Sequence, residues 1–247
     1  MQNLLFKICY DGTNYHGYQV QKNAVSVMTV LQNAIEKFTG VREPIVGCSR
    51  TDAGVHAYEY YFHMKTDLPL PPKAYVHGLN RVLPKDIAVL SCEPVSMDFH
   101  ARYHAKAKQY LYRIYNAPIR SPFYEGYALY YPRKLDDHLL DREAKAYLGT
   151  HDFAAFCSTG SKIRDTVRTI TQADVSRSGD VVTFTVTGNG FLYNMVRIMV
   201  GTLLRINEGR LAPGELKHVI ESKDRSLAGK TAPAHGLYLN HVEYFDA

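Results

Sequence analysis

Tryptophan is absent from this chain of 247 residues, and so is any long apolar run. A helix that crosses a bilayer needs roughly 18 to 20 apolar residues, and no stretch approaches that length. The chain begins Met1-Gln2-Asn3-Leu4-Leu5-Phe6-Lys7, without the basic segment and long apolar region of a signal peptide. The sequence therefore predicts a cytoplasmic protein.

Paired cysteines are also lacking. The four cysteines are Cys9, Cys48, Cys92 and Cys157, and they form no C-x-x-C pair. In a cytosolic protein this spacing predicts four free thiols, with neither a zinc site nor disulfides.

Several motifs that carry chemistry are missing as well. The chain has no G-x-x-x-x-G-K-[ST] phosphate loop and no G-x-S-x-G nucleophile motif. Gly188-Asn189-Gly190 lacks the third glycine of a dinucleotide fingerprint. His100 and His104 are four residues apart, but no acid lies between them and no third metal ligand accompanies them. By elimination, we expect a reaction run by a carboxylate, with no metal and no cofactor.

What the chain has is a globular composition, a positive charge and many tyrosines. Hydrophobic residues make up 46% and charged residues 21%, and the formal net charge is +5. This charge favours a polyanionic partner. The 19 Tyr and 10 Phe fit two interpretations, half-buried strand residues or platforms that stack nucleic-acid bases, and composition leaves both open.

The hydrophobic periodicity predicts two similar α+β halves, residues 1–98 and 99–247. The first half has predicted strands at 4–10, 44–46, 58–64 and 87–95, and predicted helices at 27–38 and 73–83. The second has predicted strands at 109–116, 166–176, 181–187 and 237–245, and predicted helices at 136–148, 191–206 and 213–222. Each half resembles a ferredoxin-like split βαβ unit, so we expect antiparallel sheets side by side, helices on one face and a central active-site cleft.

The stretch Gly47-Cys48-Ser49-Arg50-Thr51-Asp52-Ala53-Gly54-Val55-His56-Ala57 joins two predicted strands of the first half. Small residues surround one arginine and one carboxylate, as on a tight connection that presents a single charged side chain. Asp52 is therefore the first candidate for the reacting carboxylate. A solvated turn aspartate is the alternative.

Two residues of the second half are candidates to meet Asp52. Arg197 falls in a predicted helix, 191–206, where nearly every neighbour is apolar. A cation there is costly unless an anion meets it, and Asp52 is the most conspicuous partner; an arginine would favour its ionised form. A pair with another acid, or a side chain reaching to solvent, is the alternative. Tyr110, on the strand at 109–116, is either a packed residue or part of the site.

Basic residues alternate with aromatic ones along parts of the second half. One stretch holds Arg102, Lys106, Lys108, Arg113 and Arg120 among Tyr103, Tyr110, Tyr112 and Tyr115, and a second cluster holds Lys162, Arg164 and Arg168. Cations between aromatics suit a phosphate backbone with exposed bases, while solvated surface charge is the alternative. We expect RNA-backbone contacts from Arg102, Lys106, Lys108, Lys162 and Arg164.

Several motifs in one order resemble the TruA family of tRNA pseudouridine synthases. The stretch 49–57 is similar to the family signature, and Tyr10-Asp11-Gly12-Thr13 with Gly17-Tyr18-Gln19 to its opening. Further similarities are Phe99-His100-Ala101-Arg102 with Lys108-Gln109-Tyr110-Leu111-Tyr112, residues 191–201, and Gly236-Leu237-Tyr238-Leu239.

The resemblance implies a function and a role for each matching residue. It implies a homodimer without cofactor that isomerises uridines 38, 39 and 40 of the tRNA anticodon stem-loop. Asp52 matches the nucleophile, Arg197 its paired arginine, and Tyr110 the tyrosine stacked on the target base and a possible base for the C5 proton. Arg50 matches the arginine that helps to extrude the nucleotide, and Leu237 an apolar residue of the base pocket. Two rivals stay open: a non-catalytic RNA-binding protein, and a metal-dependent hydrolase built on His100 and His104.

Overall fold

The computed structural model describes residues 1–160 and 163–244, and the chain divides into two compact units. The first unit is Met1–Lys106 together with the chain from Tyr238 onward, and the second is Ala107–Leu237. The sequence predicts a single boundary after residue 98. The structure moves that boundary to residue 106 and returns the end of the chain to the first unit, because the last strand pairs with a strand of that unit.

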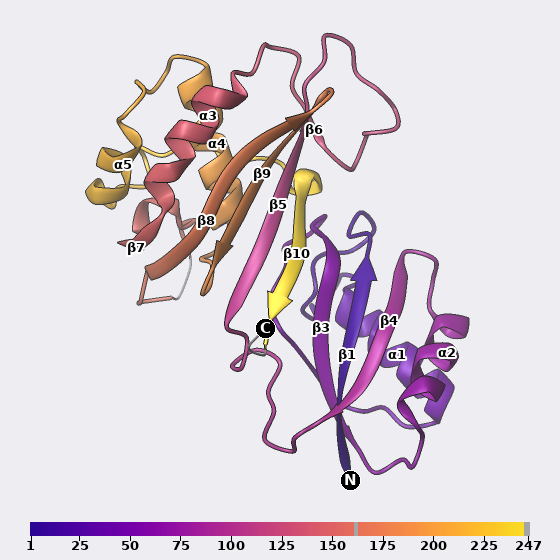
Figure 1. Ribbon diagram of the computed structural model, residues 1–247. Helices are drawn as coiled ribbons and strands as arrows, with labels where there is room; N and C mark the ends of the chain where they lie inside the picture. The colour runs from indigo at the N-terminus through magenta and orange to yellow at the C-terminus, as the bar shows by residue number, and fades with distance from the viewer. Residues whose placement is uncertain (161–162, 245–247) are drawn as a thin grey trace. The chain divides into compact units, whose positions relative to one another are not determined.

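The first unit is a sheet with two helices (Figure 1). Its elements are β1 (Gln2–Tyr10), α1 (Val27–Thr39), β2 (Ile45–Gly47), β3 (His56–Thr66), α2 (Pro72–Val82), β4 (Ile87–Val95) and β10 (Leu237–Glu243). The strand order is β4-β1-β3-β10, and β2 pairs with β3. The pairs β1–β3 and β1–β4 are antiparallel, whereas β10 runs parallel to β3.

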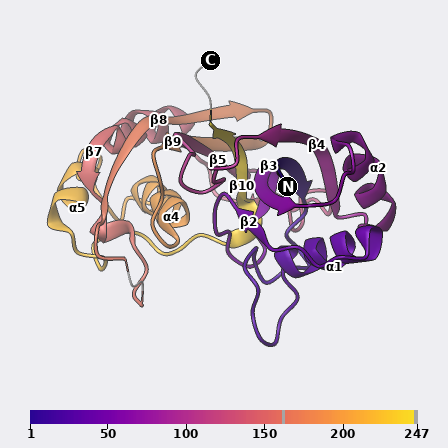
Figure 2. The same cartoon turned by 90° about the horizontal axis from the view of Figure 1, so that it is seen from below.

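Aromatic packing fixes both helices to one face of the first sheet. The rings of Phe6 and Phe62 stack with centroids 4.6 Å apart, and Tyr75 of α2 meets Phe6 edge-on. Phe38 of α1 packs edge-on against Tyr75, so α1 and α2 lie next to each other (Figure 2). The helix α1, predicted over 27–38, ends at Thr39, because Gly40 has a φ of 77°, the left-handed conformation that glycine adopts readily.

The second unit consists of further strands and three helices. Its elements are β5 (Ala107–Tyr115), β6 (Leu129–Tyr130), α3 (Asp137–Ala144), β7 (Gly149–Asp152), β8 (Val167–Ser178), β9 (Val181–Gly188), α4 (Met195–Asn207) and α5 (Leu216–Ser222), with short 3₁₀ turns at Lys145–Tyr147, Ala154–Phe156 and Ala234–Gly236. The order β5-β9-β8-β7 is antiparallel throughout, and β6 runs parallel to β5.

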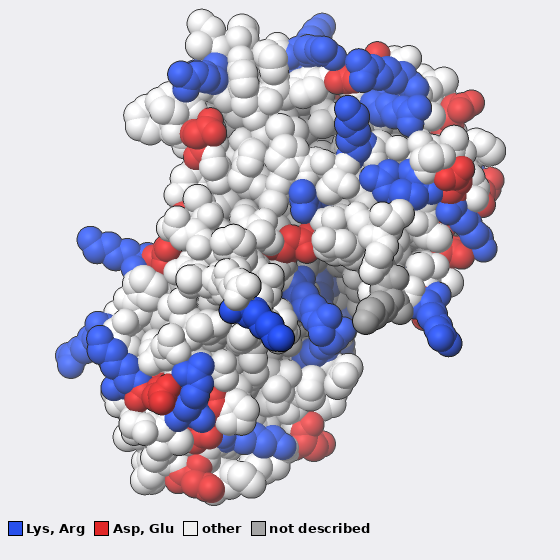
Figure 3. All heavy atoms as spheres, turned by 180° about the vertical axis from the view of Figure 1, so that it is seen from behind, with Lys and Arg blue, Asp and Glu red and all other residues white. Residues whose placement is uncertain are grey.

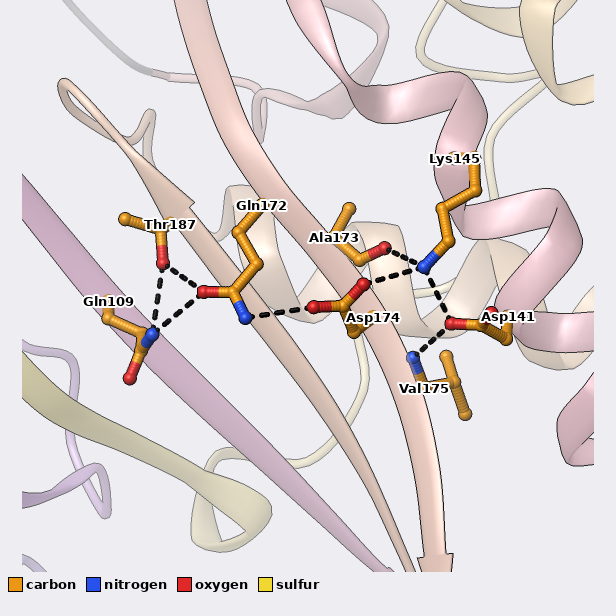
Figure 4. A network of polar contacts seen from close by, with 8 residues as sticks. All are labelled: Gln109, Asp141, Lys145, Gln172, Ala173, Asp174, Val175 and Thr187. Carbon is orange, nitrogen blue, oxygen red and sulfur yellow. Dashed lines mark hydrogen bonds and ion pairs between the residues drawn. The ribbon is translucent and has the colours of Figure 1, made fainter.

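A polar network connects three strands of this sheet and joins the sheet to α3 (Figure 4). Gln109 of β5 donates to Gln172 of β8 at 2.9 Å and to Thr187 of β9 at 3.1 Å. Lys145, just after α3, lies 2.6 Å from Asp174 of β8 and 2.7 Å from Asp141 of α3. The hydrogen bond from Lys145 holds the pKa of the Asp174 carboxyl below its usual value. The network therefore holds β5 in place at Gln109, the residue before Tyr110.

The predicted α+β class is confirmed, whereas some predicted boundaries are wrong. The helix predicted from Phe191 begins at Met195, because Asn194 has a left-handed φ of 60° that a helix does not continue through. The helix predicted to reach Leu148 ends at Ala144 and tightens into a 3₁₀ turn. The last predicted strand ends at Glu243, and Phe245 lies outside the described residues. The central cleft stays a prediction.

No helix of the described residues is long and apolar enough to span a membrane.

Candidate functional site

Asp52 lies in the first unit, on the irregular connection from β2 to β3. At its start the Cys48 amide donates to the carbonyl of Tyr61 at 2.8 Å, and the hydroxyl of Tyr60 donates to the carbonyl of Ser49. Thr51 is buried, Asp52 is half-buried and Arg50 is exposed. The connection is therefore anchored to β3 at its base and presents the two charged side chains nearer its surface.

Two glycines from the segment after β1 lie directly against this connection. A Cβ on Gly17 would lie 2.4 Å from the carbonyl oxygen of Thr51, and a Cβ on Gly12 would lie 2.0 Å from that of Val55. Gly17 also has a φ of +83°, which other residues adopt only with strain. The amide of Tyr18 donates to the carbonyl of Thr51 at 3.2 Å. Backbone therefore packs on backbone on both sides of Asp52.

A buried tyrosine cluster supports the same connection. The hydroxyl of Tyr10 is hydrogen-bonded to Oγ1 of Thr51 at 2.8 Å. The rings of Tyr18 and Tyr60 stack with centroids 4.3 Å apart. Burial raises the pKa of both Tyr18 and Tyr60, so their hydroxyls stay neutral at physiological pH.

His56 connects the end of the Asp52 connection to β10. Its Nδ1 lies 3.0 Å from the amide of Gly12 and 3.0 Å from a carboxylate oxygen of Asp11. Its ring stacks on that of Tyr238 with centroids 4.7 Å apart, and only 2% of the residue is exposed. The last strand thus packs against the residues that hold Gly12 in place.

Tyr110 and Leu237 both lie in the second unit. Tyr110 is 6% exposed, and the ring of Phe191 meets it edge-on at 5.0 Å. Leu237 is also 6% exposed and follows a 3₁₀ turn that packs on β5. A Cβ on Gly236 would lie 2.7 Å from the ring of Tyr112, so that turn reaches β5 only through a glycine.

Arg197 lies near the start of α4 in the second unit. Its Nε donates to the carbonyl of Ala232 at 2.6 Å, and an Nη donates to the side chain of Asn194 at 2.8 Å. The backbone amide of Ala232 in turn donates to the carbonyl of Arg197 at 3.1 Å. The two acceptors, a backbone carbonyl and a side-chain amide oxygen, are neutral groups that orient the guanidinium.

The segment that orients Arg197 is fixed to the rest of the second unit. The hydroxyl of Tyr112 donates to the carbonyl of Pro233 at 2.8 Å. A Cβ on Gly201 of α4 would lie 1.7 Å from the carbonyl oxygen of Lys230, so α4 and this segment touch backbone to backbone. Burial raises the pKa of Tyr112, although the nearby charge of Arg197 opposes the shift. Arg197, Tyr112 and Leu237 thereby share one supporting segment.

The predicted site residues divide between the units. Asp52 and Arg50 belong to the first unit, and Tyr110, Arg197 and Leu237 belong to the second. The pairing of Arg197 with Asp52 stays a prediction.

The predicted RNA-backbone residues also divide between the units. Arg102 and Lys106 are exposed in the first unit, and Arg164 is exposed and Lys108 half-buried in the second. Lys162 lies outside the described residues. Lys and Arg side chains spread over the face drawn in Figure 3, with Asp and Glu side chains among them.

Sequence reasoning missed the residues that hold Asp52 in place. Gly12 and Gly17 entered only through the resemblance of their motif, and His56 and Tyr238 had no assigned part. Glycines spaced along a loop are the available signal, but the connection they touch, residues 51–55, is distant in the chain. The sequence also offers His100 and His104 as candidate metal ligands. Among the described residues, no group of three or more His, Cys, Asp or Glu is placed to hold a metal ion.

Comparisons with known proteins agree on one family. A family model described as tRNA pseudouridine synthase matches residues 8–104 and 144–245. A protein of Acetivibrio thermocellus named tRNA pseudouridine synthase A is 46% identical over 244 residues, which cover 99% of this chain and all of the relative. A protein of Clostridium acetobutylicum with the same name is also 46% identical, with the same coverage. One of Ruminiclostridium cellulolyticum is 44% identical over 245 residues.

Proposed function

Since the chain belongs to the tRNA pseudouridine synthase A (TruA) family and is a tRNA pseudouridine synthase, we propose that it isomerises uridines 38, 39 and 40 of the anticodon stem-loop with Asp52 as nucleophile. The observation that carries the role of Asp52 is the backbone packing of Gly12 and Gly17 on both sides of it. A carboxylate on a backbone held this tightly can be aimed at one atom, which is what nucleophilic catalysis needs.

The reaction is an exchange of bonds within one nucleotide. The bond from N1 of the base to C1′ of the sugar breaks, the base turns, and a bond from C5 to C1′ forms. C5 loses a proton and N1 gains one, so no oxidant, reductant or transferred group is required. Asp52 attacks either C1′ of the sugar or C6 of the ring, and both routes regenerate the free carboxylate.

The other residues have roles that follow from their chemistry. Arg197, oriented by Ala232 and Asn194, pairs with Asp52 and keeps it ionised. Tyr110 stacks on the uracil ring and is the candidate to remove the C5 proton, while Leu237 supplies apolar contact. Extruding the base costs a few kcal/mol, of which stacking on Tyr110 returns about 1 to 3 kcal/mol. Arg50, exposed beside Asp52, fills the space the base leaves.

Two further properties belong to the same proposal. The enzyme works as a homodimer, as the family resemblance implies. It acts in the cytoplasm, where its tRNA substrate is made and used.

The test uses unmodified tRNA tritiated at C5 of its uridines. The wild-type protein should release tritium, with or without EDTA, and chemical mapping should place the new pseudouridines at positions 38, 39 and 40. Release without modification at those positions would contradict the assigned sites. The absence of any tritium release would favour a non-catalytic RNA-binding protein. Release that is lost when EDTA is added would indicate a metal-dependent reaction.

A further inference from the structure

The turn after β4 presents the ring of Tyr103 to solvent. Tyr103 is 75% exposed, and its inner face stacks on the imidazole of His100 with ring centroids 4.2 Å apart and planes 25° apart. The guanidinium carbon of Arg102 lies 5.9 Å from the centroid of the same ring. The outer face of the ring is therefore open to a ligand, while a second ring backs it and a cation lies beside it.

Hydrogen bonds within the turn hold that ring in place. The carbonyl of His100 accepts from the amides of Tyr103 at 3.2 Å and His104 at 3.0 Å. The Nδ1 of His100 accepts from the amide of Arg102 at 3.2 Å, and the Nδ1 of His104 accepts from the amide of His100 at 3.0 Å. Two imidazoles thus satisfy the backbone of a short turn. The ring of Tyr103 is therefore held in place before a ligand binds, so ordering it upon binding costs little free energy.

The turn is also fixed to the sheet beneath it. The amide of Ala101 donates to Nδ1 of His63 at 3.1 Å, and its carbonyl accepts from the hydroxyl of Tyr244 at 2.7 Å. Burial and the neighbouring His100 lower the pKa of His63 to about 4, so this imidazole is neutral and can accept at physiological pH. The exposed ring therefore stands on a rigid base rather than on a mobile loop.

The charges around the ring favour an anionic partner. Arg102 is exposed, and Lys65 of β3 is close enough to help lower the pKa of both His63 and Asp98. Asp98 is the acidic residue at the start of the turn, and a hydrogen bond from Ser96 engages its carboxylate. A planar ring beside a guanidinium can stack a base and neutralise the phosphate attached to it.

We propose that Tyr103, backed by His100 and flanked by Arg102, is a platform on which an unpaired base of the tRNA stacks. The inference rests on the proposed function for the identity of the RNA. The base is unpaired because a base inside a duplex has both faces covered by its neighbours. The platform contributes to holding the tRNA and takes no part in the exchange of bonds.

Binding of unmodified tRNA at fixed salt tests the platform. Tyr103→Ala should raise the Kd for tRNA about 10-fold, the scale of one lost base–aromatic stack, and should raise KM more than it lowers kcat. Tyr103→Phe keeps the ring and should bind within twofold of the wild type. Phe123→Ala removes a ring of the second unit that is 89% exposed and should leave the Kd unchanged. A rise in Kd for Phe123→Ala as large as that for Tyr103→Ala, or an unchanged Kd for Tyr103→Ala, would overturn the proposal.

A fluorescent reporter tests stacking itself, because the chain has no tryptophan. Tyr103→Trp would carry the only indole, and a stacked base should quench its fluorescence when tRNA is added. Heparin, a polyanion without bases, should not quench it. Quenching by heparin would show a response to charge alone, and quenching that depends on protein concentration without RNA would indicate a second copy as partner. If the wild type releases tritium and the reporter does not respond, the platform fails while the proposed function stands.

Discussion

Asp52 of the first unit lies on an irregular connection, whereas Arg197 of the second lies on a regular helix, α4. In the first unit, Gly12 and Gly17 bring a separate loop against the backbone on both sides of the functional residue. In the second, the helix supports its own backbone, and Gly201 brings another segment against it. The position of Asp52 therefore depends on the segments packed against its loop, whereas the position of the Arg197 guanidinium depends on the acceptors that orient it.

Apart from the loss of the Asp52 carboxylate itself, the largest effect should follow from removing the charge of Arg197. Arg197→Met should lower turnover about 1,000-fold, because the carboxylate proposed to pair with it would lose its counter-charge, while tRNA still binds. Arg205→Met on the same helix is the matched control, since the Arg205 guanidinium donates to the backbone carbonyl of Leu227 at 3.0 Å, and it should keep turnover near the wild-type value. Tritium release and filter binding measure the two quantities. Unchanged turnover in Arg197→Met would count against the ion pair.

A smaller but still large effect is expected where the loop packs on the Asp52 connection. Gly17→Ala places a Cβ 2.4 Å from the carbonyl of Thr51, and a displacement of about 1 Å at a reacting group can cost about 100-fold in rate. Gly40→Ala has a similar left-handed φ but nothing within 4 Å of the added Cβ. It should lose about 1 kcal/mol of stability and no turnover. Equal turnover in both variants would show that the packing does not position Asp52.

The corresponding change in the second unit should act more on stability than on rate. Gly201→Ala forces α4 away from Lys230 and should lower the free energy of unfolding by about 3 kcal/mol. Gly209→Ala, with a φ of +68° and nothing within 4 Å, should lower it by about 1 kcal/mol. Urea unfolding followed by circular dichroism measures both. An equal loss of unfolding free energy in the two variants would show that the contact between Gly201 and Lys230 contributes no stability of its own.

The smallest effects should come from single hydroxyls. Tyr10→Phe removes the bond to Thr51 in the first unit, and Tyr112→Phe removes the bond to Pro233 in the second. Each should cost about 1 kcal/mol of stability. Tyr10→Phe should slow turnover at saturating tRNA more than Tyr112→Phe, because Thr51 is the chain neighbour of Asp52, whereas Pro233 acts on Arg197 only through Ala232. Slower turnover in Tyr112→Phe together with wild-type turnover in Tyr10→Phe would contradict this expectation.

Local pattern was enough to predict most of the elements. The amphipathic spacing before Gly40 predicted α1, and alternation predicted β4 to the residue. The start of α4 was missed because a left-handed Asn194 leaves no mark on hydrophobic periodicity. The strand β6 has two residues and is too short to carry a period. The pairing of β10 with β3 joins distant parts of the chain, which no local pattern encodes.

The candidate site was predictable in part. Small residues around Asp52 and a cation among apolar residues at Arg197 were visible in the sequence, and the family resemblance gave each a role. The supports were not visible. Gly12 lies directly against the carbonyl of Val55, and the carbonyl of Ala232 accepts a hydrogen bond from the guanidinium of Arg197. Such contacts depend on the folded chain.

The carboxylate of Asp52 is the group on which the proposed reaction depends most, and Asp52→Asn removes its charge with little change in size. Tritium release from tRNA labelled at uridine C5 should fall to background in this variant, while its Kd for tRNA stays within about threefold of the wild type. Tritium release by Asp52→Asn at the wild-type rate would contradict the assignment of Asp52 as nucleophile.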